Sequence, residues 1–83
     1  MYSIFILRRA QAAIRKLPDG PQGKVRAAIA ALALVPRPPG CTKLVGHDAW
    51  RLRVGVYRVI YEIDDGVRIV TIIDTGHRRD VYR

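Results

Sequence analysis

One stretch decides the fold, residues 50–61, which read Trp-Arg-Leu-Arg-Val-Gly-Val-Tyr-Arg-Val-Ile-Tyr. Apolar and basic residues alternate on both sides of a glycine, a pattern typical of a β-hairpin with one buried face and one polar face. We expect Gly55 and Val56 to form the two-residue turn, of type II′, because glycine adopts the positive φ of the first turn position without steric cost. This register sets Arg53 opposite Arg58.

The two faces of the predicted hairpin differ in chemistry. The apolar face is expected in the core and carries six side chains: Trp50, Leu52, Val54, Tyr57, Val59 and Tyr61. The polar face collects Arg51, Arg53 and Arg58. Like charges directly opposed across a ladder destabilise a sheet. We therefore expect the three arginines to bind something anionic.

Size and charge limit what the protein can be. A chain of 83 residues buries about 60–65% of its unfolded surface in a single core, so residues 1–83 are predicted to form one domain. The net charge is +8, from 12 Arg and 3 Lys against 7 acids. Such a balance indicates a nucleic acid, an anionic membrane surface or an acidic protein partner, and the alternative is a surface that is merely cationic.

Several functional classes lack their characteristic residues. The single cysteine, Cys41, cannot form an internal disulfide, which fits a reducing compartment. His47 and His77 have no companion ligands near them, so we expect no metal and no cofactor. No signal peptide is recognisable, and the longest apolar run, residues 27–36, is too short to span a bilayer. These features predict a cytoplasmic protein that does not associate with membranes.

The N-terminal half predicts a strand and a helical hairpin. Residues 2–7 are β-branched and aromatic, as in a strand. The apolar spacing over residues 7–17 and 25–35 is helical. Asp19 or Gly20 is predicted to cap the second helix.

The C-terminal half predicts a connector and further strands. Residues 36–40 contain three prolines and a glycine, which exclude a helix, and residues 41–45 predict a short edge strand. A turn at residues 64–66 precedes a last strand over residues 67–75.

Two registers are possible for this last strand. A two-residue turn sets Arg68 opposite Ile63, whereas a three-residue loop sets it opposite Glu62. The charge match favours the second register, which places Val67, Ile69, Thr71 and Ile73 on the apolar face. The fold class is then α+β, with an N-terminal strand and a helical hairpin packed on one face of a small antiparallel β-sheet.

The chain end adds a second set of polar groups. His77, Arg78 and Tyr82 follow the last strand and reach one end of the sheet. The sequence has no glycine-rich phosphate loop, and neither Ser3 nor Cys41 has a base nearby to make it a nucleophile.

The remaining groups match the needs of RNA cleavage without a metal. The 2′-hydroxyl must lose a proton, the charge on phosphorus must be neutralised, and the departing 5′-oxygen must gain a proton. Arginines can supply the second need, and an imidazole or a phenol can supply the proton transfers. Phosphate or acidic-peptide binding without catalysis is an equal alternative from the chemistry alone.

Three segments resemble the RelE toxins of the RelE/ParE superfamily: Lys43-Leu44, residues 50–63, and the terminal Gly-His-Arg-Arg-Asp-Val-Tyr of residues 76–82. The resemblance implies a RelE-like fold and the toxin of a type II toxin–antitoxin system. Such a toxin enters the ribosomal A site, contacts 16S rRNA and cuts mRNA there. A cognate protein antitoxin neutralises it in a hetero-oligomer.

The resemblance also assigns roles to residues. The catalytic residues that it implies are Arg53, Arg58, Arg78 and Tyr82, and the chemistry of the remaining groups adds His77 to this catalytic set. The substrate-binding pair is Arg51 and Lys43, and no metal is expected.

The sequence departs from the family pattern at Arg51, which replaces a lysine that is a candidate general base in relatives. An arginine stays protonated and is a poor proton acceptor. His77 is the substitute candidate for the general base, because imidazole titrates near neutral pH. Alternatively, His77 is a turn residue that is hydrogen-bonded to the backbone.

Two further functions remain open. A ParE-like toxin that inhibits DNA gyrase without cleaving RNA has the same fold and antitoxin. The other function is that of a simple basic RNA-binding module. The sequence lacks the interleaved exposed aromatic residues that single-strand binders use.

Overall fold

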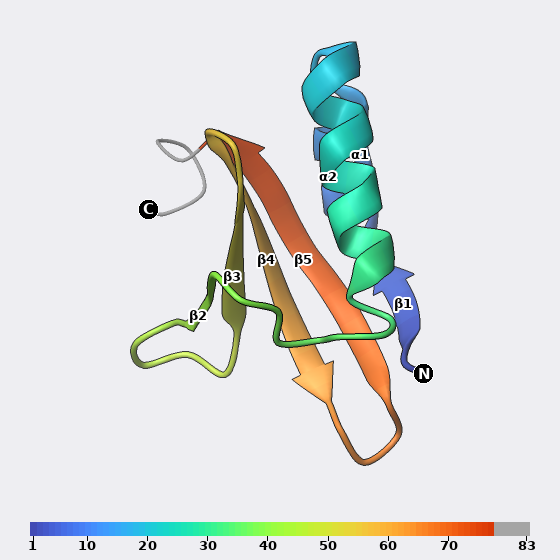
Figure 1. The fold of residues 1–83 in the computed structure, drawn as a ribbon, viewed down its shortest axis with the longest axis vertical. Helices are drawn as coiled ribbons and strands as arrows, with labels where there is room; N and C mark the ends of the chain where they lie inside the picture. The colour runs from blue at the N-terminus through green and yellow to red at the C-terminus, as the bar shows by residue number, and fades with distance from the viewer. Residues whose placement is uncertain (78–83) are drawn as a thin grey trace.

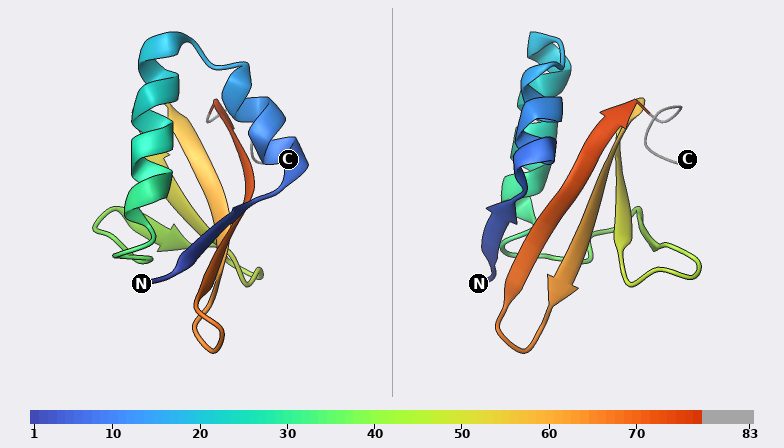
Figure 2. Two further views of the ribbon diagram at one scale, coloured as in Figure 1. Left: turned by 90° about the vertical axis from the view of Figure 1, so that its right-hand side faces the viewer. Right: turned by 180° about the vertical axis from the view of Figure 1, so that it is seen from behind.

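The structure, a computed structural model, describes residues 1–77. Its seven elements are β1 (Ser3–Ile6), α1 (Arg8–Arg15), α2 (Asp19–Ala31), β2 (Cys41–Lys43), β3 (Trp50–Val54), β4 (Tyr57–Asp64) and β5 (Ile69–His77). The strands form one sheet in the order β1-β5-β4-β3-β2. Both helices lie against one face of that sheet (Figures 1 and 2). The other face, free of helices, is called the outer face below.

This arrangement confirms the predicted α+β class. The sheet is mixed, because β1 pairs in parallel with β5, whereas the pairs β2–β3, β3–β4 and β4–β5 are antiparallel. Neither helix within residues 1–77 is long and apolar enough to cross a membrane.

The helices bury one stripe each. α1 buries Ala10 and Ile14, and α2 buries Val25 and Ile29. The second stripe ends sooner than predicted, since α2 ends at Ala31 and Val35 is 51% exposed.

The predicted cap of α2 is also wrong. Pro18 is the N-cap and its carbonyl accepts the amide of Gln22 at 2.8 Å, whereas Asp19 lies in the first turn. A carboxylate there is stabilised by the positive end of the helix dipole.

The core lies between the helices and the sheet. Its sheet side consists of Leu52, Val59, Tyr61, Val70 and Ile72. The ring of Tyr61 is fully buried, and its hydroxyl donates to the carbonyl of Pro36 in the connector at 2.8 Å. Burial raises the pKa of this hydroxyl. The hydrogen bond from the Tyr61 hydroxyl thus holds the connector against the core.

The central hairpin has the predicted register. Arg53 pairs with Arg58, and Val54 pairs with Tyr57. Gly55 has a φ of 63°, whereas Val56 is not among the described residues with positive φ. This combination is the one expected for a type II′ turn.

Both predicted registers for the last strand are wrong. Asp64 pairs with Ile69, so the loop spans residues 65–68 and Arg68 lies in it with a φ of 59°. The reason is local: a carboxylate oxygen of Asp64 accepts the amides of Gly66 and Val67 at 3.0 and 3.2 Å, which closes a wider loop.

The apolar face of β5 therefore differs from the prediction. Val70 and Ile72 are fully buried, while Ile69 is exposed. A β-bulge follows, because Tyr61 pairs with Ile72 but Ile60 pairs with Asp74, so Ile73 is an extra residue.

Candidate functional site

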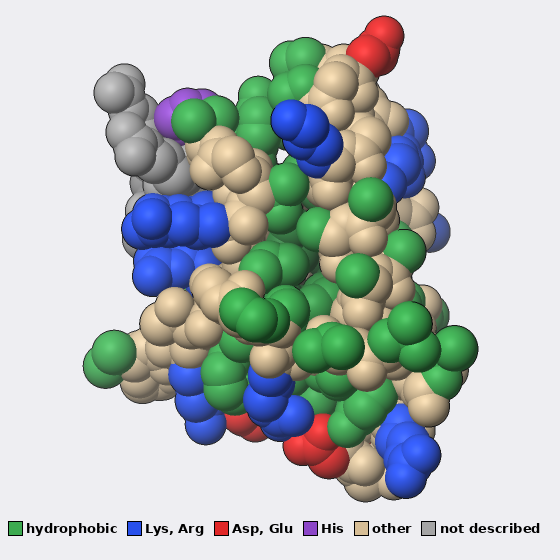
Figure 3. Space-filling model, viewed as in Figure 1, with side chains coloured by type: hydrophobic (Ala, Val, Ile, Leu, Met, Phe, Trp, Pro, Cys, Tyr) green, Lys and Arg blue, Asp and Glu red, His purple; other side chains and the backbone are tan. Residues whose placement is uncertain are grey.

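The three hairpin arginines lie together on the outer face. Arg51 and Arg53 come from β3 and Arg58 from β4, with Arg53 directly opposite Arg58. Arg53 is exposed, and the other two are half-buried. Figure 3 shows Lys and Arg side chains gathered beside β3, on the side away from the helices. The predicted grouping of these arginines is confirmed by the register.

The backbone at Arg58 is held from the opposite strand. The Nε atom of Arg58 is buried. The Thr75 hydroxyl donates to the Arg58 carbonyl at 2.9 Å. Sequence reasoning missed Thr75. The available signal was a threonine within an apolar strand that precedes the candidate tail residues.

His77 does not share the face of the arginines. It pairs with Tyr57, and directly paired residues point to the same side of a sheet. Tyr57 belongs to the core side, and the two rings meet edge to face with centroids 5.9 Å apart. His77 is, however, next to Gly76, which pairs with Arg58. Arg78 and Tyr82 lie outside the described residues.

Lys43 is also separated from the arginines. Its partner across the ladder is Trp50, so its position lies on the Trp50 side of the sheet. Its ammonium lies 3.9 Å from a carboxylate oxygen of Asp48, and both side chains are exposed. The structure therefore does not bring Lys43 into the arginine group.

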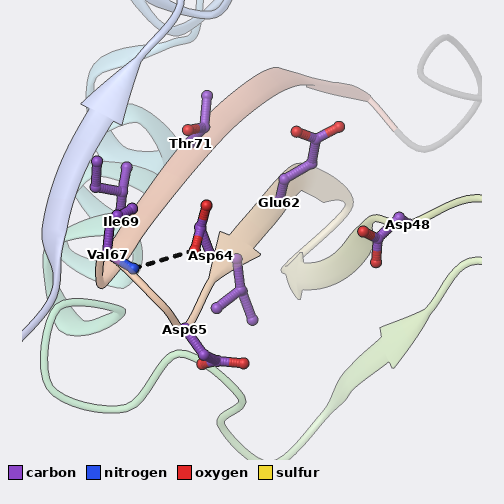
Figure 4. Close-up of a pocket in the computed structure, with 8 residues that line it drawn as sticks. Asp48, Glu62, Asp64, Asp65, Val67, Ile69 and Thr71 are labelled. Atoms are coloured by element: carbon purple, nitrogen blue, oxygen red, sulfur yellow. Dashed lines mark hydrogen bonds between the residues drawn. The ribbon is translucent and has the colours of Figure 1, made fainter.

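The outer face carries opposite charge at its other end. Glu62 and Asp64 of β4 line an open pocket of about 480 Å³, together with Asp48 and Asp65 (Figure 4). The close-up shows Asp64 and Asp65 at the β4–β5 loop, with Asp64 accepting from the Val67 amide. A polyanion is attracted to the hairpin half of this face and repelled from the loop half.

A polar cluster behind β3 positions the start of that strand. Arg37 makes a two-point ion pair with Asp65, at 2.9 and 3.3 Å, and its guanidinium lies 5.2 Å from the ring centroid of Trp50. Tyr2 donates its hydroxyl hydrogen to the same Asp65 carboxylate. The hydrogen bond from Arg37, and then that from Tyr2, lower the pKa of Asp65. The cluster joins the N-terminus, the connector and the β4–β5 loop next to Trp50, the first residue of β3.

Comparison with known proteins decides the family. Residues 4–82 match the family described as the ParE toxin of the type II toxin–antitoxin system, parDE. The chain belongs to this family. It is thus a type II toxin–antitoxin toxin of the RelE/ParE superfamily. A comparison with curated protein sequences found no significant match.

Solved structures of other toxins share the fold. The archaeal RelE–RelB complex from Pyrococcus horikoshii matches with a TM-score of 0.84 and 26% identity, covering 96% of this chain and 98% of that one. The isolated RelE toxin of E. coli matches with a TM-score of 0.80 and 25% identity, covering 99% and 92%. A YoeB/ParE toxin from Agrobacterium tumefaciens, at 13% identity, shares the fold with a TM-score of 0.77 over 92% and 98% of the chains.

The arginine group has the chemistry needed for charge neutralisation. Guanidinium groups bind phosphate oxygens in a bidentate manner and keep their charge when partly desolvated. Within residues 1–77 no cluster of His, Cys, Asp and Glu is arranged to hold a metal ion. The candidate residues within the described range that lie near one another are three arginines on one face and an imidazole at the end of β5.

Proposed function

We propose that this toxin is a metal-independent endoribonuclease that cuts mRNA in the ribosomal A site, and that residues 1–83 act as one toxin domain in the cytoplasm. The observation that carries the proposal is the direct opposition of Arg53 and Arg58, with Arg51 on the same face. Opposed like charges weaken the hairpin. A bound phosphate removes that repulsion, so the arrangement is best suited to an RNA backbone.

The chemistry assigns the arginines to the phosphate. Arg53 and Arg58 hold the scissile phosphate, and Arg51 steadies the neighbouring charge. The 2′-oxygen loses its proton and attacks phosphorus, the bond from phosphorus to the 5′-oxygen breaks, and a 2′,3′-cyclic phosphate forms. Charge accumulates on the phosphoryl oxygens in this transition state, where fixed cations stabilise it most. DNA lacks the attacking hydroxyl, so the reaction is specific for RNA.

The proton transfers need other groups. Arg51 is a poor base, because an arginine stays protonated. His77 and Tyr82 are the candidates, with Arg78 adding charge. For His77 the support is proximity along the chain, since its neighbour Gly76 pairs with Arg58. Lys43 lies on the Trp50 side of the sheet, away from the arginines. In this proposal it contacts substrate or 16S rRNA at the periphery of the site.

A cognate antitoxin is the proposed protein partner. Matching structures include RelE bound to RelB in Pyrococcus horikoshii and the intact RelBE complex of E. coli. A net charge of +8 favours an acidic segment. Such a segment competes with RNA for the arginines in the hetero-oligomer.

A second candidate function is inhibition of DNA gyrase without RNA cleavage. It is favoured by the family match, which is to ParE toxins. The opposed arginines count against it, because a toxin that acts only through protein contacts has no need for a phosphate clamp.

One experiment separates the two functions. Translating ribosomes are incubated with the toxin in magnesium buffer, which the ribosome itself requires, and new 5′ ends and the upstream product ends are mapped on the mRNA, while supercoiling by gyrase is assayed in parallel. A-site cleavage that leaves a 2′,3′-cyclic phosphate is expected, with no effect on gyrase. Arg58→Ala should abolish cleavage and Arg15→Ala, which removes an exposed arginine of α1, should not. Gyrase inhibition with intact mRNA supports the second function instead.

A further inference from the structure

Thr75 is an exception in the core. It is 3% exposed and is the one polar residue among the buried residues of the described part of the chain, where the others are hydrophobic. A hydroxyl buried without a partner costs about 1–3 kcal/mol. The partner it has therefore indicates what the residue does.

That partner is the backbone of a site residue. Thr75 pairs across the ladder with Val59, and its Oγ1 donates to the carbonyl of Arg58 at 2.9 Å. The bond thus runs from the core side of β5 to the second residue of β4. It fixes the strand beneath the Arg58 side chain.

The β-bulge is what places this hydroxyl in the core. Without the extra residue Ile73, continuous pairing from Tyr61 and Ile72 would set Thr75 opposite Arg58 on the outer face. With it, Thr75 returns to the buried side and Gly76 takes the position opposite Arg58. Bulges commonly redirect side chains near functional sites. Because of the bulge, the position opposite Arg58 is occupied by Gly76, which has no side chain, and not by Thr75.

The hairpin needs such a restraint. Directly opposed residues have Cβ atoms about 4.5–5.5 Å apart, so the like charges of Arg53 and Arg58 repel each other. A strand end next to a two-residue turn can relieve that repulsion by moving. A hydrogen bond to the Arg58 carbonyl opposes this movement.

We propose that Thr75 is a positioning residue for the phosphate-binding arginines, which keeps Arg58 beside Arg53 in the free toxin. The inference rests on the proposed function for its catalytic consequence. Its structural consequence, the position of Arg58, is measurable without RNA. A misplacement of about 1 Å costs an enzyme on the order of 100-fold in rate.

The test compares three variants. Thr75→Val replaces the hydroxyl by a methyl group and keeps a β-branched side chain that the core accepts. Thr75→Ser keeps the hydroxyl and loses the methyl group. Thr71→Val is the matched control, because it makes the same change on the same strand opposite Glu62, on the outer face. Each variant is measured for thermal unfolding, for kcat and KM of A-site cleavage, and for the NMR resonance of the Arg58 Nε–Hε group.

The outcomes are distinct. Thr75→Val should shift the Arg58 resonance and lower kcat by about 10- to 100-fold, in a protein that remains folded. Thr75→Ser should keep the resonance, with kcat within about threefold of wild type, and Thr71→Val should match wild type. A Thr75→Val protein with an unshifted resonance overturns the inference, as does a Thr75→Ser protein as impaired as Thr75→Val. A wild-type toxin without cleavage refutes the proposed function alone, since the resonance still reports on Arg58.

Discussion

Removing the charge of Arg53 should stabilise the toxin while weakening its hold on RNA. Arg53 is exposed and directly faces Arg58. For a separation of roughly 7 Å, somewhat above the Cβ spacing of opposed residues, two unit charges repel by about 0.6 kcal/mol in water. Salt screens it: the Debye length is about 30 Å at 0.01 M, about 8 Å at 0.15 M and about 3 Å at 1 M. The repulsion is then about 0.5, 0.25 and below 0.1 kcal/mol, respectively.

The assay is urea or thermal unfolding of Arg53→Gln at these three salt concentrations. At 0.01 M the melting temperature should rise by about 2–4 °C, and the gain should vanish at 1 M. Arg15→Gln is the control, because it removes the same charge from the exposed end of α1, away from the hairpin. In single-stranded RNA binding, Arg53→Gln should reduce the salt dependence by about 0.7 in log-log slope. A gain equal to that of Arg15→Gln, or one that persists at 1 M salt, would refute local repulsion as its cause.

Three further predictions follow from single contacts. Tyr61→Phe removes the hydroxyl that donates to Pro36 and should lower the free energy of unfolding by about 1–2 kcal/mol; an unchanged urea midpoint would contradict this. The pKa of Asp65 is lowered by the hydrogen bond from Arg37, so its stabilisation is present above the unfolded pKa of about 3.9 and is lost as pH falls through the folded value; the melting temperatures of wild type and Asp65→Asn should converge as the pH falls below about 4. His77→Gln should lower the cleavage rate by about 100-fold if the imidazole transfers a proton, and a change under about threefold would leave His77 a structural role that includes its ring contact with Tyr57.

The parts of the fold that follow local rules were predictable from sequence. The hairpin of β3 and β4 has alternating side chains and a glycine at its turn, and both signals lie within twelve residues. The parallel pairing of β1 with β5 joins Ser3 to Ile69, far apart in the chain. No local pattern encodes such a pairing, because it depends on where the two helices place β1.

The site was predictable only in part, for the same reason. The grouping of Arg51, Arg53 and Arg58 follows from alternation, whereas the Arg37–Asp65 ion pair joins a connector to a distant loop. The bulge at Ile73 could not be predicted from the sequence, because the apolar pattern of β5 is compatible with two registers when the strand contains an extra residue.

The bulge also bears on the proton-transfer step. In an unbroken ladder His77 would lie on the outer face, two residues along the strand from a Thr75 facing Arg58. The extra residue turns His77 to the side of Tyr57 and leaves Gly76 opposite Arg58. The hairpin arginines and the imidazole therefore lie on opposite faces, and they come near each other only at the end of β5. The glycine between them contributes no side chain, so a proton-transfer role for His77 requires the reacting ribose to lie across Gly76.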